Sequence, residues 1–146
     1  MKLKNDTMKK LIPILLLILL YSCSTTKKTV DNKLYNVLVS SEYGGGNFRF
    51  YEIITEAKEF KMLLGDDEIK KFVKPDDIKT ANFILVNLGE KNNGGYGVEV
   101  ESVVEEADKV IVTIKEIEPK KGNVTMAITN PYAVIKINSK KPIEIK

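Results

Sequence analysis

Apolar and polar residues alternate along most of the second half of the chain, which is the pattern of half-buried β-strands. The alternation is clear in residues 96–101, 110–114, 124–128, 133–137 and 143–145, and turn-forming residues separate these segments. One apolar and one charged face per strand is typical of antiparallel sheets. Parallel strands need crossover helices, for which these segments leave no room. We therefore expect an antiparallel meander that forms a sandwich or a partly closed barrel.

The centre of the chain combines a largely apolar run with a glycine-rich turn. Residues 81–88 are followed by Asn92–Gly97, in which three glycines surround one tyrosine. The pair Asn93-Gly94 is a strong hairpin signal, because both central positions of the favoured turn need positive φ. The pattern predicts a strand, a reversal and a second strand.

The first half adds two further strands and a helical segment. Residues 35–41 and 48–54 are rich in β-branched and aromatic residues, and the glycine-rich stretch 43–47 between them predicts a hairpin. Thr55 suits the start of a helix that Gly65 ends, and a second short helix follows and stops before Pro75. The predicted fold class is thus mainly β with a helical segment (α+β), with one or two short helices packed on the sheets.

The N-terminal residues have the pattern of a secretory signal. Lys9 and Lys10 precede a ten-residue apolar run, which is too short for the ~20 residues of a transmembrane helix. The signal covers residues 1–22, residues 23–33 form a flexible tether, and 34–146 are one β-rich domain. Either Met1 or Met8 is the start.

Cys23 is the single cysteine and follows Leu20-Tyr21-Ser22, which resembles a bacterial lipobox. The sulfur would carry diacylglycerol, and two or three acyl chains would hold the protein firmly to a membrane. We therefore expect a lipid-anchored protein of the bacterial cell envelope, on either the periplasmic or the surface face.

Charge and composition exclude several functions. The chain has 23 Lys+Arg and 20 Asp+Glu, but residues 1–22 hold four of the former and one of the latter, so the remainder is neutral. A neutral domain gives no argument for nucleic-acid binding. There is no histidine, and Cys23 is committed to lipid. We expect no enzyme activity, no metal and no cofactor.

Two turns place a tyrosine after a constrained backbone: Asn93-Gly94-Gly95-Tyr96 and Thr129-Asn130-Pro131-Tyr132. In a simple up-and-down arrangement they lie at opposite ends of the sheet. They converge only if a bulge or break divides a strand, as near residues 102–104, where the alternation slips.

These turns and the strands after them resemble the C-terminal domain of the protease-complex subunit PrcB. That family has a Thr-Gly-Gly-Tyr-Ser segment after a strand and a Thr-x-Pro-Tyr segment before the last strand, and the PrcB-like part here is about 81–146. Two positions differ, since Asn93 stands for the threonine and Gly97 for the serine. The resemblance implies a lipoprotein that associates with and stabilises a cell-surface protease complex. Candidate partner-binding residues are Asn93 and the six motif residues Gly94, Gly95, Tyr96, Thr129, Pro131 and Tyr132, for which a purely structural role is equally open.

Two alternatives remain. The sequence Asn92-Asn93-Gly94-Gly95-Tyr96 is faintly similar to a loop of chagasin-type protease inhibitors, which would make the protein an inhibitor. The third hypothesis is a structural envelope lipoprotein or small-ligand binder, for which a large apolar pocket would be evidence.

Overall fold

The computed structural model describes residues 34–120, 122 and 125–146. The predicted signal, Cys23 and the tether lie outside these residues. The described chain forms seven strands, one α-helix and two 3₁₀ turns. In chain order these are β1 (Tyr35–Ser41), β2 (Arg49–Ile54), α2 (Ala57–Gly65), η1 (Ile69–Lys71), η2 (Asp77–Lys79), β3 (Asn82–Leu88), β4 (Gly97–Glu105), β5 (Val110–Ile117), β6 (Tyr132–Ile137) and β7 (Ile143–Ile145).

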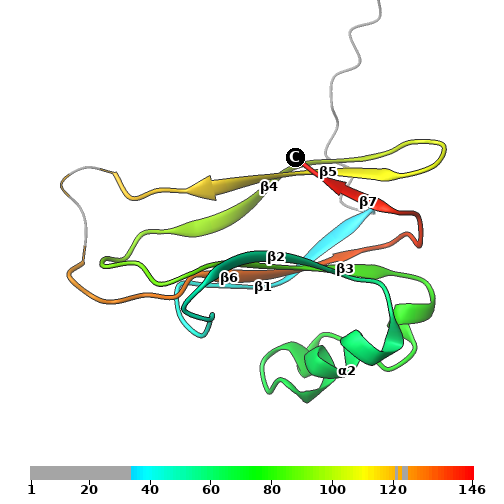
Figure 1. Cartoon of the computed structure of the whole chain (residues 1–146), viewed down its shortest axis with the longest axis horizontal. Helices are drawn as coiled ribbons and strands as arrows, with labels where there is room; N and C mark the ends of the chain where they lie inside the picture. The colour runs from blue at the N-terminus through cyan, green and yellow to red at the C-terminus, as the bar shows by residue number, and fades with distance from the viewer. Residues whose placement is uncertain (1–33, 121, 123–124) are drawn as a thin grey trace, which may run out of the picture.

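The strands form two stacked sheets, with the helical segment on the outer face of the larger one (Figure 1). The four-stranded sheet has the order β1-β6-β3-β2, and all its pairs are antiparallel. The three-stranded sheet has the order β4-β5-β7. The predicted class, mainly β with a helix, is confirmed.

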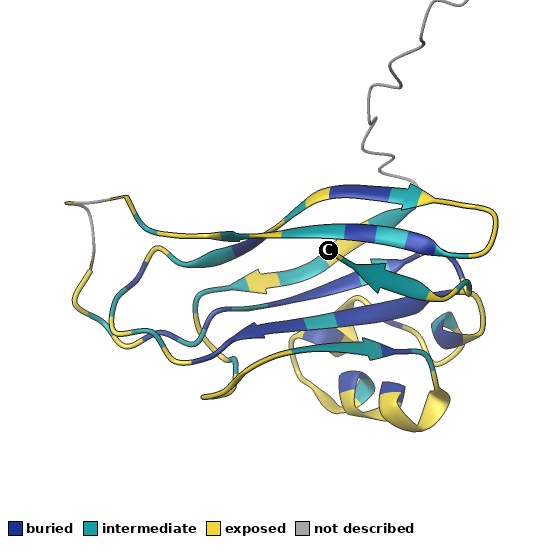
Figure 2. Cartoon of the chain, turned by 45° about the horizontal axis from the view of Figure 1, so that its top comes forward, coloured by how far each residue is buried: buried dark blue, intermediate teal, exposed yellow. Residues whose placement is uncertain are grey.

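The larger sheet is buried on both faces, because alternate residues of its central strands point to different neighbours. Ile84 and Ile135 belong to the cluster between the sheets. Phe83 and Val134 belong to the cluster beneath the helical segment, where Phe83 stacks on Phe60 of α2 with ring centroids 4.6 Å apart. Figure 2 shows the buried positions concentrated in β3 and β6. Burial on both faces explains why residues 81–88 are largely apolar rather than alternating.

The predicted hairpin at residues 35–54 is wrong, since β1 and β2 lie at opposite edges of the larger sheet. The glycine loop (residues 43–47) crosses the ends of β6 and β3 instead. Gly45 N–H donates to Asn130 O at 2.9 Å, and Asn87 Nδ2 donates to Gly46 O at 3.0 Å. Glycines suit this crossing because the backbone passes close over two other strands.

The predicted Asn93-Gly94 hairpin is also wrong, because β3 and β4 belong to different sheets. No non-glycine residue in the described part of the chain has a positive φ, so Asn93 lacks the conformation that this turn type needs. Between β3 and β4 the positive φ values fall on Gly89 (74°) and Gly95 (92°). The segment between them carries the chain from one layer of the sandwich to the other.

Two further predictions from the alternation fail. Residues 125–128 of the expected strand 124–128 are irregular, and the side chains of Met126 and Ile128 are 97% and 65% exposed. The alternation there is typical of a strand, but residues 125–128 do not pair with the edge of either sheet. The pair β5–β7 is parallel, because the connection between them passes through β6 in the other sheet and so needs no crossover helix.

The first predicted helix is confirmed with a shift at its start, whereas the second is shorter than predicted and of another type. Helix α2 begins after Glu56, not Thr55, and Gly65 is its last residue. The second predicted helix is the single 3₁₀ turn η1, and η2 follows Pro75. An ion pair between Lys136 Nζ of β6 and Asp77 Oδ1 at 3.1 Å fixes η2 to the sheet.

Candidate protein-binding surface

The two motif turns meet at one end of the sandwich. Lys91 and Thr129 exchange two backbone hydrogen bonds of 2.8 and 2.9 Å, and the Thr129 hydroxyl donates to Asn93 O at 2.9 Å. Simple alternation of strands predicted opposite ends. The turns converge because residues 125–128 do not form the expected strand, which would have carried the Thr129 turn to the opposite end. The register shift between Val100 and Ser102 lies close to the predicted slip, but it is not what joins the turns.

The motif glycines are explained by close contacts within the protein. Gly94 is buried, its N–H donates to Thr125 O at 3.1 Å, and a Cβ atom there would lie 2.3 Å from Thr125 Oγ1. Gly95 has a φ of +92°, and its Cβ would lie 2.8 Å from Pro119 Cβ. A side chain at either position would force the turn apart. A contact of these glycines with a partner stays a prediction.

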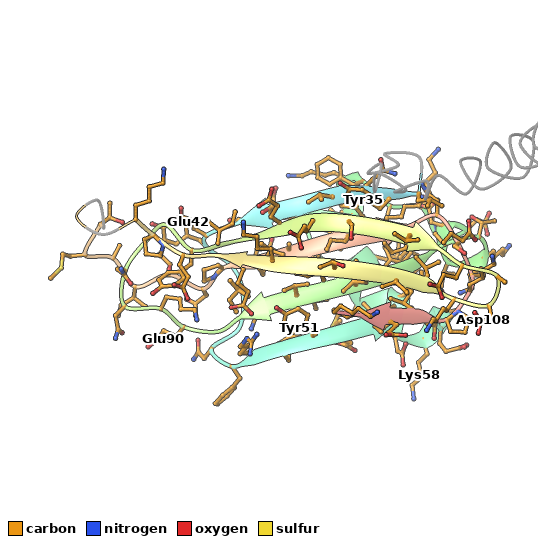
Figure 3. The ribbon with its side chains drawn as sticks, turned by 90° about the horizontal axis from the view of Figure 1, so that it is seen from above. Tyr35, Glu42, Tyr51, Lys58, Glu90 and Asp108 are labelled. Carbon is orange, nitrogen blue, oxygen red and sulfur yellow. The ribbon has the colours of Figure 1, made fainter. Side chains whose placement is uncertain are left out.

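Glu42 joins the glycine loop to both motif turns, and the sequence did not single it out. Its backbone oxygen accepts from Asn130 N at 2.9 Å, and its Oε2 accepts from Gly95 N at 3.3 Å. Figure 3 shows Glu42 at the end of the sandwich opposite Asp108 of the β4–β5 turn. The sequence does place this carboxylate next to a glycine loop. Backbone N–H groups of glycine-rich turns need acceptors, so Glu42 could have been considered as one.

The two motif tyrosines point to different sides of the larger sheet. Tyr96 packs against the cluster between the sheets, with Lys91 Nζ 5.0 Å from the centre of its ring. Tyr132 packs against the cluster beneath the helical segment. Thr129 and Pro131 are buried, and Pro131 O accepts from Leu88 N at 2.9 Å. Of the seven candidate residues, Tyr132 lines a groove on the helical side of the larger sheet, whereas Gly95 and Tyr96 line a separate, smaller hollow.

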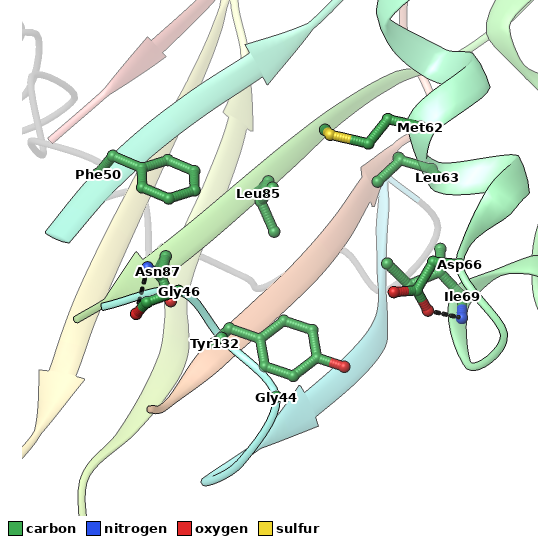
Figure 4. Close-up of a pocket in the computed structure, with 11 residues that line it drawn as sticks. Gly44, Gly46, Phe50, Met62, Leu63, Asp66, Ile69, Leu85, Asn87 and Tyr132 are labelled. Atoms are coloured by element: carbon green, nitrogen blue, oxygen red, sulfur yellow. Dashed lines mark hydrogen bonds between the residues drawn. The ribbon is translucent and has the colours of Figure 1, made fainter. Parts of the chain in front are cut away.

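This groove, which we call the Tyr132 groove, separates the glycine loop and the end of β1 from the turn between α2 and η1. Its outer part has a volume of about 790 Å³ and its inner part about 140 Å³, and Gly44, Asp66 and Tyr132 line both. Figure 4 shows the inner part, where the Tyr132 phenol points from β6 toward the segment that holds Asp66 and Ile69. Large exposed side chains rim the groove: Tyr43, Phe50, Met62 and Phe72, each at least 40% exposed.

The groove wall formed by the α2–η1 turn is acidic. Asp66, Asp67 and Glu68 line the outer part, and none of the described lining residues is lysine or arginine. Asp66 Oδ1 accepts from the N–H groups of Glu68 and Ile69, both at 2.9 Å, which holds the carboxylate in place. Burial raises the pKa of the Tyr132 phenol, and the charges of Asp66 and Glu68 raise it further. The phenol is therefore a neutral hydrogen-bond donor at physiological pH.

Asn87 closes the inner end of the groove. Its Nδ2 donates to Gly46 O and Phe48 O, which holds the glycine loop against β3. Its Oδ1 is buried and has no hydrogen-bond partner among the described residues. A Cβ atom at Gly45 would lie 2.2 Å from this oxygen, so only glycine fits above it.

Metal and membrane features can be stated for the described residues only. Within residues 34–120, 122 and 125–146, no group of three acidic, histidine or cysteine side chains is placed to hold a metal ion. No helix in the same part of the chain has the length and apolar character needed to cross a membrane.

The fold and the groove define a small β-sandwich domain with a helical layer and an open, aromatic-rimmed groove on that side. Residues 82–138, from the start of β3 to just after β6, match the family model described as PrcB C-terminal. The chain is 33% identical over 128 residues to an uncharacterized protein of Methanocaldococcus jannaschii, and the alignment covers 86% of this chain and 74% of that protein. Residues 82–138 therefore form a PrcB C-terminal domain, as the motif turns predicted for about residues 81–146. No solved structure matches.

Proposed function

We propose that the protein is a non-catalytic binding module of the cell envelope, and that it associates with and stabilises a protease complex through the Tyr132 groove. The observation that carries the proposal is the position of Tyr132. It is a family motif residue, and it lies in the groove around which large exposed apolar side chains gather, whereas Gly94, Thr129 and Pro131 are buried.

The composition of the groove supports protein recognition. Aromatic residues and methionine are enriched in protein interfaces, and exposed large apolar side chains that gather in one place mark interaction sites. Tyr43, Met62 and Phe72 are each more than half exposed around one hollow. Isolated exposed apolar residues need no explanation, but a rim of them around a motif tyrosine does.

The small-ligand alternative has less support. Ligand pockets typically have volumes of roughly 300–1,000 Å³ and bury most of their ligand. The inner hollow of about 140 Å³ is too small for this, and the larger outer part is an open groove. The inhibitor alternative stays a prediction, which an inhibition assay on a panel of cysteine and serine proteases would test.

The direct test is partner capture from the native membrane with tagged full-length protein. Tyr132→Ala removes the groove tyrosine, and we expect it to lower capture of the bound protease at least tenfold. Tyr96→Ala is the matched control, because it removes the other motif tyrosine, which packs against the cluster between the sheets and lines a separate hollow. Folding of both variants is checked by circular dichroism. Undiminished capture by folded Tyr132→Ala protein would rule out the groove as the binding surface.

The proposal includes attachment to a membrane through Cys23, the single cysteine of the chain. A single acyl chain binds only reversibly, so stable attachment needs the two or three chains of a lipoprotein. We expect labelled fatty acid to enter the wild-type protein and not Cys23→Ser, with the variant moving to the unattached fraction. Equal labelling of the two proteins would contradict the anchor.

A further inference from the structure

The Tyr132 groove offers two features that recognise the same kind of chemical group. It is lined by the aromatic rings of Tyr132, Tyr43 and Phe72 and by the carboxylate of Asp66. A ring face and a carboxylate both attract a cation. Among cationic side chains, the planar guanidinium of arginine both stacks on aromatic rings and forms two parallel hydrogen bonds to a carboxylate.

Of the three carboxylates that line the groove, Asp66 alone has no lysine or arginine partner among the described residues. Lys70 and Lys71 lie nearby, but their Nζ atoms are paired with Asp67 at 2.5 Å and Glu68 at 2.7 Å, and neither lysine lines the groove. Asp66 makes no ion pair among the described residues, and the two backbone N–H groups that it binds both donate to Oδ1. Its second oxygen is therefore open to a donor from an occupant.

We propose that the groove binds an arginine side chain presented by a segment of the partner protein. The guanidinium lies against the Tyr132 ring and donates to Asp66, while the rest of the segment packs on Tyr43 and Phe72. This inference rests on the proposed function and specifies the chemistry of its partner.

The test uses three synthetic peptides, glycine and serine throughout except for a central arginine, lysine or citrulline. Citrulline has the shape of arginine without the charge. Each peptide is titrated into ¹⁵N-labelled full-length protein in detergent micelles, and the amide shifts of Gly44, Gly46 and Asp66 report the groove. We expect the arginine peptide to shift these amides, the lysine peptide to bind several-fold more weakly, and the citrulline peptide to leave them unchanged.

Asp66→Asn provides the matched variant, because asparagine keeps the oxygen that accepts the two backbone N–H groups. We expect this variant to bind the arginine peptide with about tenfold lower affinity. Glu101→Gln makes the same change in net charge at an exposed position of β4, and we expect it to leave peptide binding unchanged. Equal binding of the citrulline peptide, or undiminished binding to Asp66→Asn, would overturn the inference. If the peptides fail while Tyr132→Ala still loses the partner, the arginine inference falls and the proposed function stands.

Discussion

At the scale of single residues, the glycines of this protein are explained by what lies next to them. A Cβ atom at Gly45 would lie 2.2 Å from Asn87 Oδ1 and 2.6 Å from Asn130 O, and neither neighbour is free to move. Asn87 is held by two carbonyl groups, and Asn130 O accepts from Gly45 itself. The glycine loop can thus lie close over the ends of β3 and β6 and form one wall of the groove, because Gly45 has no side chain.

This explanation predicts opposite effects of two alanine substitutions. Gly45→Ala should lower the free energy of unfolding by roughly 1–3 kcal/mol, because it overpacks a fixed site. Gly65→Ala is the control, because no atom lies within 4 Å of its Cβ and its φ is not positive. We expect Gly65→Ala to raise the free energy of unfolding by about 0.4–1 kcal/mol, because alanine lowers the conformational entropy of the unfolded chain. Urea unfolding of both variants measures the difference, and a neutral Gly45→Ala would refute this account of the loop.

At the scale of elements, a polar cluster joins the two sheets beside β2. Arg49 and Tyr51 of β2 both donate to Glu116 Oε1 of β5, Tyr51 at 2.7 Å. Burial raises the pKa of Glu116, but the hydrogen bonds from Tyr51 and Arg49 outweigh burial, so this pKa lies below its ordinary value. The ionised carboxylate is therefore the form that the folded protein stabilises.

The lowered pKa gives a pH dependence with a defined sign. Glu116 contributes stability above the ordinary glutamate pKa of about 4.3, and the contribution is lost as the pH falls through the lower folded value. We expect Glu116→Gln to lower the Tm at pH 7, with the difference from wild type shrinking below about pH 4. Glu101→Gln, at an exposed position of β4, should show no such convergence. A Tm difference for Glu116→Gln that stays constant from pH 7 to pH 3 would exclude the ionised pair as its cause.

Element types were predictable from the sequence, whereas their pairing was not. Alternation identified β5, β6 and β7, and the apolar run identified β3, because these patterns follow from local geometry. The hairpin signals at residues 43–47 and 93–94 failed, because the glycines serve close approach and passage between layers rather than tight turns. Nothing local distinguishes these uses of glycine.

The same limit applies to the candidate site. The motif identified Tyr132, but the groove also needs Asp66 and Phe72, which are about sixty residues earlier in the chain. Only the packing of the helical segment on β6 and β3 brings them together. Glu42 was missed for the same reason, since its partners are Gly95 and Asn130.

At the scale of the whole molecule, the two motif tyrosines line two different surface hollows. The Tyr132 groove lies on the helical side of the larger sheet. A second, smaller hollow of about 280 Å³, lined by Glu42, Tyr96 and Ile117 among others, lies beside the other motif turn. The central claim is that the partner binds the first of these surfaces.

Site-specific photo-crosslinking in the native membrane tests this claim most directly. A photoreactive phenylalanine analogue is placed at Phe72 in the groove or at Ile117 in the second hollow, which are 54% and 42% exposed. We predict that the probe at position 72 crosslinks the protease and that the probe at position 117 does not. Crosslinking from position 117 alone would contradict the account and place the partner at the glycine turn.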